Sequence, residues 1–197
     1  MTIEAVVLEN AHVRLEPLEE RHREPLRVAG ADPDLWRFAN VNLDGTDFDA
    51  WIDHRLGEIA RTDEVTWAVF DKASGAFVGS TSYLAVVPAH RRLEIGWTWY
   101  AKSVWAGAVN PSCKRMLFAH GFDVLGLNRI ELKADARNQR SCRAMERFGA
   151  KFEGIHRSHM VRPGGLLRDT AWFSVIREEW PAVRDGLDAR LAAFAAP

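Results

Sequence analysis

The sequence is poor in several features that would mark particular classes of protein. Only two of its 197 residues are cysteines, Cys113 and Cys142, and both fall in helical patterns among apolar neighbours. Two such residues do not form a disulfide framework, so we expect buried thiols and a reducing compartment. No apolar run approaches the ~20 residues that span a bilayer, and residues 1–10 lack the pattern of a signal peptide. The sequence therefore predicts a cytoplasmic protein with no membrane partner.

An excess of charge of one sign is also missing. The chain has 26 basic and 27 acidic residues, for a formal net charge of -1. Binding to a phosphate backbone needs a basic excess, so we expect no nucleic-acid partner. Hydrophobic residues make up 47% and charged residues 27%, an ordinary globular composition. The length suits one domain, and we expect a single domain over residues 1–197.

The order of hydrophobic patterns predicts the fold class. A strand near residues 13–17 precedes two helices, three antiparallel strands, a helix, a strand, a helix, two strands and a last helix at about 178–195. This order predicts an α+β domain with a mixed, mostly antiparallel central sheet of about seven strands, flanked by helices. Gly79, inside the strand 77–87, is expected to mark a bulge or a close approach of two backbones.

The strand predicted over residues 92–100 has a clear alternation. Strict period two would place one set of side chains on one face, and a second set, with Glu94 in it, on the other. The first set is Leu93, Ile95, Trp97 and Trp99, and the second is Glu94, Gly96 and Thr98.

Two helix starts carry residues that suit a ligand. After Ala106-Gly107-Ala108 we expect a helix with Asn110 as its N-cap and Pro111 in its first position. The free N–H groups of such a start suit a phosphate, although neither a P-loop nor a dinucleotide-binding pattern is present. Asn138 and Ser141 open a second helix on one of its faces, and a plain N-cap would explain them equally well.

Taken together, these segments resemble the GNAT N-acetyltransferase superfamily, in particular its RimJ/RimL-like branch. The resemblance is carried by residues 93–99, 105–110, 138–141 and 146–150. It implies that acetyl-CoA lies between two splayed strands, with no metal required. The residues that it implies for CoA binding are Gly96, Trp97, Thr98, Trp99, Trp105, Ala106, Gly107, Ala108, Val109, Asn110, Asn138 and Ser141. The chain departs from the family pattern at Ala108, where a glycine is usual, and at Asn110.

The resemblance also implies a reaction, the transfer of an acetyl group from acetyl-CoA to a primary amine. Glu94 is the expected general base, unless it is an ordinary strand residue paired with Arg91 or Arg92. A main-chain N–H near Trp97 would stabilise the oxyanion. Ser141 would give a proton to the leaving thiolate, since the helix lacks the tyrosine that many relatives use.

The remaining expectations concern the acceptor and the charges. Trp36, Phe38 and Trp67 are expected to line the acceptor pocket with Glu94 and the hairpin 156–168, although each aromatic also suits the core. His156 and His159 should face opposite sides of a strand, so no metal site is predicted. The basic residues that could meet the CoA phosphates are Lys114, Arg137, Arg140 and Arg143.

Three questions stay open at the level of sequence. The acceptor amine could be a protein N-terminus, a polyamine, an aminoglycoside or an amino acid. The protein could be a monomer or a homodimer. A CoA-binding module without catalysis is the alternative to an enzyme.

Overall fold

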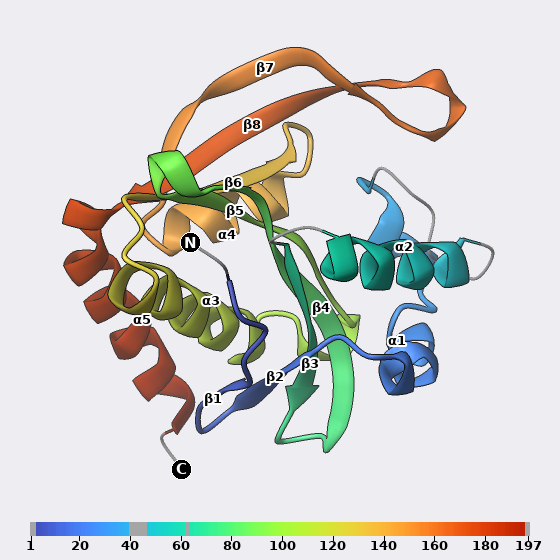
Figure 1. Cartoon of the computed structure of the whole chain (residues 1–197), viewed down its shortest axis with the longest axis horizontal. Helices are drawn as coiled ribbons and strands as arrows, with labels where there is room; N and C mark the ends of the chain where they lie inside the picture. The colour runs from blue at the N-terminus through green and yellow to red at the C-terminus, as the bar shows by residue number, and fades with distance from the viewer. Residues whose placement is uncertain (1–2, 40–46, 62–63, 196–197) are drawn as a thin grey trace.

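The computed structural model describes residues 3–39, 47–61 and 64–195 (Figure 1). Within these residues one sheet has eight strands in the order β1-β2-β3-β4-β5-β6-β8-β7. The strands are β1 (Leu8–Glu9), β2 (Val13–Pro17), β3 (Val65–Asp71), β4 (Ala76–Val87), β5 (Arg92–Tyr100), β6 (Arg129–Asp135), β7 (Lys151–Val161) and β8 (Leu167–Ile176). The predicted α+β class is confirmed, and the strand beyond the expected seven is the two-residue β1, which pairs with β2.

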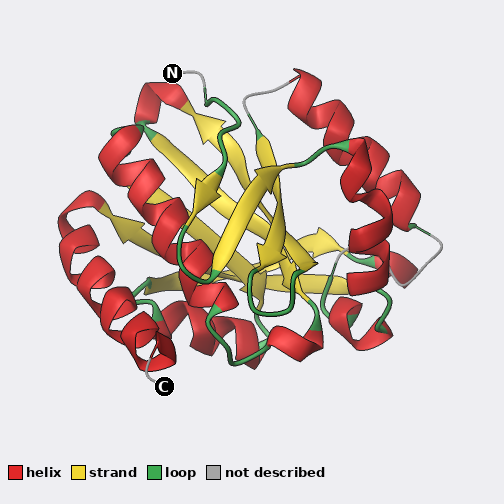
Figure 2. Cartoon of the chain, turned by 90° about the horizontal axis from the view of Figure 1, so that it is seen from below, coloured by secondary structure: helices red, strands yellow, loops and turns green. Residues whose placement is uncertain are grey.

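Helices cover both faces of this sheet, as the two views show (Figures 1 and 2). They are α1 (Arg23–Ala29), α2 (Phe48–Arg61), α3 (Val109–Ala119), α4 (Gln139–Arg147) and α5 (Trp180–Ala195). Helices α1 and α2 lie on one side, and α3, α4 and α5 lie on the other. In the part of the chain that the structure describes, no helix is long and apolar enough to cross a membrane.

Each side of the sheet has its own hydrophobic core. The larger core joins strand residues to α3, α4 and α5 and includes Leu93, Leu117, Phe173 and Val183. The smaller core lies under α1 and α2 and is rich in tryptophan; its buried residues are Leu18, Leu26, Trp36, Phe48, Trp51, Ile52, Ala68 and Trp99. Because aromatic side chains bury large apolar areas, these tryptophans account for much of the packing on the α1/α2 side.

The sheet is open between β5 and β6. These two strands are parallel, and their pairing covers Arg92 to Glu94 on β5 against Arg129 to Glu131 on β6. Beyond Glu94 the two strands diverge, while β5 stays paired with β4 on its other edge. The main chain from Ile95 to Tyr100 therefore has one edge without a strand partner among the described residues, at the centre of the sheet.

A β-bulge lies in β5 beside this opening. Between Gly96 and Trp99 the strand has one more residue than the paired part of β4, and Trp97 adopts a left-handed φ of 47°. The bulge resets the alternation, because the residues after it exchange faces. Trp97 and Trp99 pack with the smaller core, whereas Thr98 faces α3. The predicted alternation is thus correct up to Gly96 and wrong after it.

Gly79 provides a test of how closely β4 and β5 approach each other. A Cβ atom added at this glycine would lie 2.1 Å from the carbonyl oxygen of Trp99. We predict that Gly79→Ala lowers the free energy of unfolding by about 1–3 kcal/mol, the usual cost of overpacking. The measurement is the urea unfolding midpoint.

The matched control is Gly186→Ala in α5, where a Cβ would meet nothing within 4 Å. This variant should gain about 0.5–1 kcal/mol, because alanine is the better helix former. Equal stabilities of the two variants would contradict the close approach at Gly79.

Candidate active site

Glu94 lies at the point where the sheet opens. Its side chain faces the α1/α2 side, is 6% exposed, and has Oε2 at 2.6 Å from the Nζ atom of Lys133 on β6. A Cβ at position 96 would lie 2.7 Å from Glu94 Oε1, so Gly96 makes room for the carboxyl group. Arg92 bonds Glu131, and the alternative in which Arg92 is the partner of Glu94 is therefore wrong.

The surroundings of Glu94 favour its protonated form. Burial raises the pKa of this carboxyl group above its ordinary value, and the ion pair with Lys133 only partly offsets that effect. Glu131 adds to the rise, whereas Arg168 opposes it. A buried carboxyl group with a raised pKa, placed at an opening in a sheet, suits the removal of a proton from a substrate.

The sequence analysis missed a group of side chains beside Glu94. The Nζ atom of Lys133 lies 4.7 Å from the ring centre of Trp172 on β8. His159 Nδ1 lies 3.1 Å from Thr170 Oγ1 on the same strand. The positions of Arg168, Thr170 and Trp172, two residues apart along β8, are the signal that would have placed them on one face.

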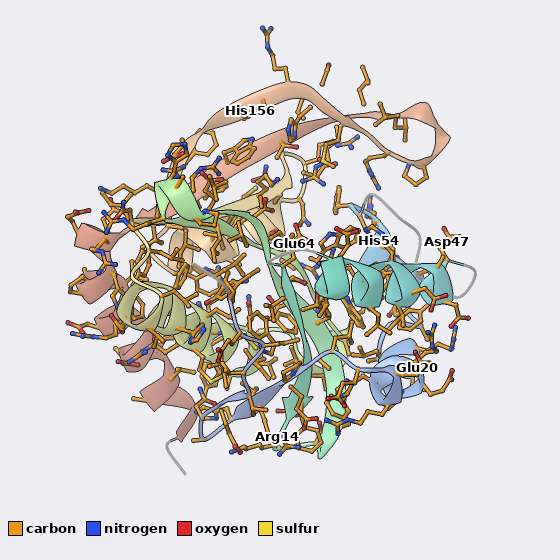
Figure 3. All side chains as sticks on the ribbon, in the orientation of Figure 1. Arg14, Glu20, Asp47, His54, Glu64 and His156 are labelled. Atoms are coloured by element: carbon orange, nitrogen blue, oxygen red, sulfur yellow. The ribbon has the colours of Figure 1, made fainter. Side chains whose placement is uncertain are left out.

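His156 and His159 lie on the same side of β7, not on opposite sides. Their ring centres are 5.4 Å apart, and His156 is 4.8 Å from the ring of Trp172. The prediction failed because Ser158 has a left-handed φ of 49° and the register between β7 and β8 shifts there. Figure 3 shows His156 on the β7–β8 hairpin, apart from His54 on α2. Among the residues described, no group of three or more His, Cys, Asp or Glu could hold a metal ion.

The hairpin is tied to the segment before α2 by Arg162. Its Nε donates to the carbonyl oxygen of Ala39 at 3.0 Å, and its Nη1 lies 3.7 Å from Asp135 Oδ2. Trp36, which is 6% exposed, packs edge-on to Trp99, and Phe38 is half-buried two residues further on. Trp36 therefore belongs to the α1/α2 side, as Glu94 does.

Trp67 does not join them. It is fully buried in the larger core on the α3 side, where its ring packs edge-on to Tyr83 and its Nε1 donates to the carbonyl oxygen of Val6. It has no exposed surface with which to line an acceptor pocket, and this position corrects the expectation.

The loop before α3 differs in detail from the prediction. The helix begins at Val109 with Ala108 as N-cap and no side-chain cap, so Asn110 lies in the first turn and is not the cap. Ala108 is right-handed, with φ at −73°, and an alanine is unstrained there. The left-handed residue is Ala106, with φ at 62°. The helix start keeps free N–H groups even though Ala108 replaces the usual glycine.

The start of α4 meets this loop. As predicted, Asn138 caps the helix, with its Oδ1 accepting a hydrogen bond from the Ser141 N–H at 3.1 Å. The guanidinium carbon of Arg140 lies 3.3 Å from the ring centre of Trp105. The Nε1 of Trp105 in turn donates to the carbonyl oxygen of Tyr100 at the end of β5. The segments singled out in the sequence therefore meet in space.

Comparison with known proteins identifies the family. A family model described as an acetyltransferase (GNAT) domain matches residues 12–151. The chain belongs to the GNAT acetyltransferase family. The N-acetyltransferase YoaA of Bacillus subtilis (strain 168), itself uncharacterized, is 26% identical to this GNAT chain over 113 residues, 57% of the chain and 63% of YoaA. The chain spans between 57% and 63% of the length of the curated relatives that it matches.

Solved structures agree with the GNAT fold over a longer range. A GCN5-related N-acetyltransferase from Brucella melitensis is 34% identical, with a TM-score of 0.89 over 97% of this chain and 87% of that one. RimJ of Mycobacterium smegmatis, solved in complex with CoA-disulfide, is 20% identical with a TM-score of 0.74 over 90% of this chain and 88% of RimJ. The likeness to RimJ is one of fold.

The raised pKa of Glu94 predicts a dependence of stability on pH. The folded protein holds this proton to a higher pH than the unfolded chain, whose Glu pKa is about 4.3. Stability should therefore fall as pH rises from about 4.3 through the folded pKa. Because Glu94→Gln cannot ionise, the Tm of the wild type relative to this variant should fall as pH rises from about 4.3 through the folded pKa of Glu94.

The control is Glu153→Gln, for which the sign is opposite. The ion pair with Arg129 lowers the pKa of Glu153 to about 2. Its stabilisation is present above about pH 4.3 and is lost as pH falls through the folded pKa. The Tm of the wild type relative to Glu153→Gln should therefore rise as pH rises from about 2 to about 4.3. If the Tm difference between the wild type and Glu94→Gln rose with pH, as it should for Glu153→Gln, the raised pKa of Glu94 would be refuted.

Proposed function

We propose that this protein is an N-acetyltransferase that moves an acetyl group from acetyl-CoA to a primary amine. The observation that carries the proposal is the parting of β5 and β6, which leaves a free main-chain edge beside a buried carboxyl group. The reaction needs both features. The main-chain edge can hold an extended ligand, and the carboxyl group can take a proton from an amine.

The cofactor would occupy the opening from one end to the other. Its pantetheine arm would pair with the main chain from Gly96 to Trp99, and its pyrophosphate would lie at residues 105–110 against the free N–H groups of α3. Asn138 and Ser141, at the start of α4, would lie near the sulfur. Support comes from the GNAT family match and from RimJ, a protein of this fold that binds CoA-disulfide.

The reaction would proceed by direct attack. An amine approaching from the α1/α2 side attacks the thioester carbonyl carbon, and Glu94 takes the proton that the nitrogen loses, directly or through a water. The oxyanion receives a hydrogen bond from a main-chain N–H at the bulge, near Trp97. The carbon–sulfur bond then breaks and its electron pair goes to sulfur. The Ser141 hydroxyl donates a proton to the departing thiolate.

The acceptor amine is the part of the proposal that needs a screen. Incubating the protein and acetyl-CoA with protein N-terminal peptides, polyamines, aminoglycosides and amino acids, and measuring thiol release, would identify the class. Tight CoA binding without thiol release for any amine would favour the alternative, a CoA-binding module without catalysis.

The placement of the pyrophosphate predicts the effect of Ala108→Glu. A carboxylate at the N-cap would occupy the space of the phosphates and repel their charge, so CoA affinity should fall by more than about tenfold, equivalent to about 1.4 kcal/mol. Isothermal titration calorimetry with CoA provides the measurement. Ala182→Glu, on the exposed side of α5, is the control and should bind CoA as the wild type does. Equal affinities of the two folded variants would rule out the placement.

The role of Glu94 predicts that Glu94→Gln lowers kcat by about 10²–10⁴-fold, the usual contribution of a general base. CoA affinity should stay near that of the wild type, because the carboxyl group is on the acceptor side. Glu153→Gln serves as the control at a carboxyl group outside the opening. A kcat for Glu94→Gln within about threefold of the wild type, far below that contribution, would show that Glu94 is not the base.

A further inference from the structure

The side chain of Lys114 lies in a place where lysine is rarely found. It projects from the second turn of α3, is only 4% exposed, and lies on the face of the sheet opposite to Glu94. Lysine is almost never buried to this extent unless it is paired, because its charge loses the solvation of water. The sequence offers Lys114 as a partner of the CoA phosphates, but its Nζ atom bonds Thr98 on β5 and not the loop at residues 105–110, so that expectation does not account for the buried amine.

Its surroundings do not neutralise it. The Nζ atom donates a hydrogen bond to Thr98 Oγ1 at 3.1 Å, and among the described residues no carboxylate lies within ion-pair distance of it. Thr98 Oγ1 is itself 2.8 Å from Thr81 Oγ1, so the hydroxyl group that Lys114 contacts is bonded to a second hydroxyl group. Hydroxyl groups solvate an ammonium but carry no negative charge, and the positive charge remains available to a ligand.

The position of Lys114 relates it to the opening in the sheet. Thr98 directly follows Trp97, whose left-handed backbone forms the bulge of β5. The Nζ atom is thus hydrogen-bonded to a side chain of the strand segment whose main chain would pair with the pantetheine arm. Glu94, on the far face, raises the pKa of Lys114 by its charge.

We propose that Lys114 is the cation that stabilises the CoA thiolate as it leaves. This inference rests on the proposed acetyl transfer. As the tetrahedral intermediate collapses, the electron pair of the carbon–sulfur bond moves onto sulfur, and the Lys114 ammonium lies against the new negative charge. The amine proton passes to Glu94 and on to solvent, and the thiolate takes its own proton from solvent or through the Ser141 hydroxyl. Lys114 begins and ends the cycle protonated.

The ionisation of Lys114 agrees with this role. Burial lowers its pKa to about 8, against the opposing effects of Cys113 and Glu94. The ammonium form therefore still predominates at pH 7, and its charge acts in a site that excludes water, where electrostatic stabilisation is strongest.

Two variants separate the charge from the hydrogen bond. Lys114→Gln keeps a donor for Thr98 without the charge, and Lys114→Met removes both. If the charge is what matters, both variants should lose about 10²-fold in kcat, in the range for lost electrostatic stabilisation of a transition state. Their Tm should not fall, because replacing a buried charge by a group of similar volume is often neutral or stabilising. Lys151→Gln, with a side chain 73% exposed, is the control and should retain the wild-type kcat.

A second measurement needs no acceptor. The thiol of bound CoA is titrated by the ultraviolet absorbance of its thiolate, with desulfo-CoA bound as the blank for Cys113 and Cys142. A nearby ammonium should make the bound thiol ionise at least about one pH unit lower in the wild type than in Lys114→Gln.

The outcomes distinguish the two proposals. A thiol that ionises at the same pH in the wild type and in both variants overturns the role of Lys114 alone, as does a Lys114→Gln enzyme with wild-type kcat. In the latter case the hydrogen bond to Thr98 would be the whole function of the side chain. CoA that does not bind the wild-type protein at all overturns the proposed function, and this inference with it.

Discussion

The structure depends on one interruption in its hydrogen bonding, the end of the β5–β6 pairing at Glu94. Up to that residue the sheet is continuous, and beyond it the two strands are held by their other neighbours, β4 and β8. An unpaired main chain at the centre of a sheet is costly unless water or a ligand satisfies its polar groups. Glu94 and the bulge at Trp97 both lie at this opening.

Two backbone irregularities then decide which side chains meet there. The bulge at Trp97 turns two tryptophans into the smaller core and leaves Thr98 facing α3. The left-handed Ser158 brings His156 and His159 to the same side of the hairpin. The bulge at Trp97 lies next to the opening, whereas Ser158 lies on the edge strand β7, and both redirect side chains as bulges commonly do.

The sequence predicted the parts of this arrangement that depend on periodic patterns and on capping. The order of elements, the cap at Asn138 and the close approach at Gly79 follow from such local signals. It did not predict the face of Trp99, because a one-residue insertion in a strand leaves no mark in composition. Trp67 was misplaced for a related reason: an alternating strand shows which residues are buried, but not on which of two buried faces.

The tie that Arg162 makes has a consequence for which side chains of the β7–β8 hairpin can vary. The match to the GNAT family ends at residue 151, where β7 begins, and the β7–β8 hairpin lies beyond it. Arg162 fastens that hairpin through the backbone carbonyl of Ala39, a contact that does not depend on which side chain residue 39 carries. The hairpin is therefore held by a contact that any residue at position 39 can provide. Its other side chains, which lie beyond the segment that the family model matches, can change without removing that contact.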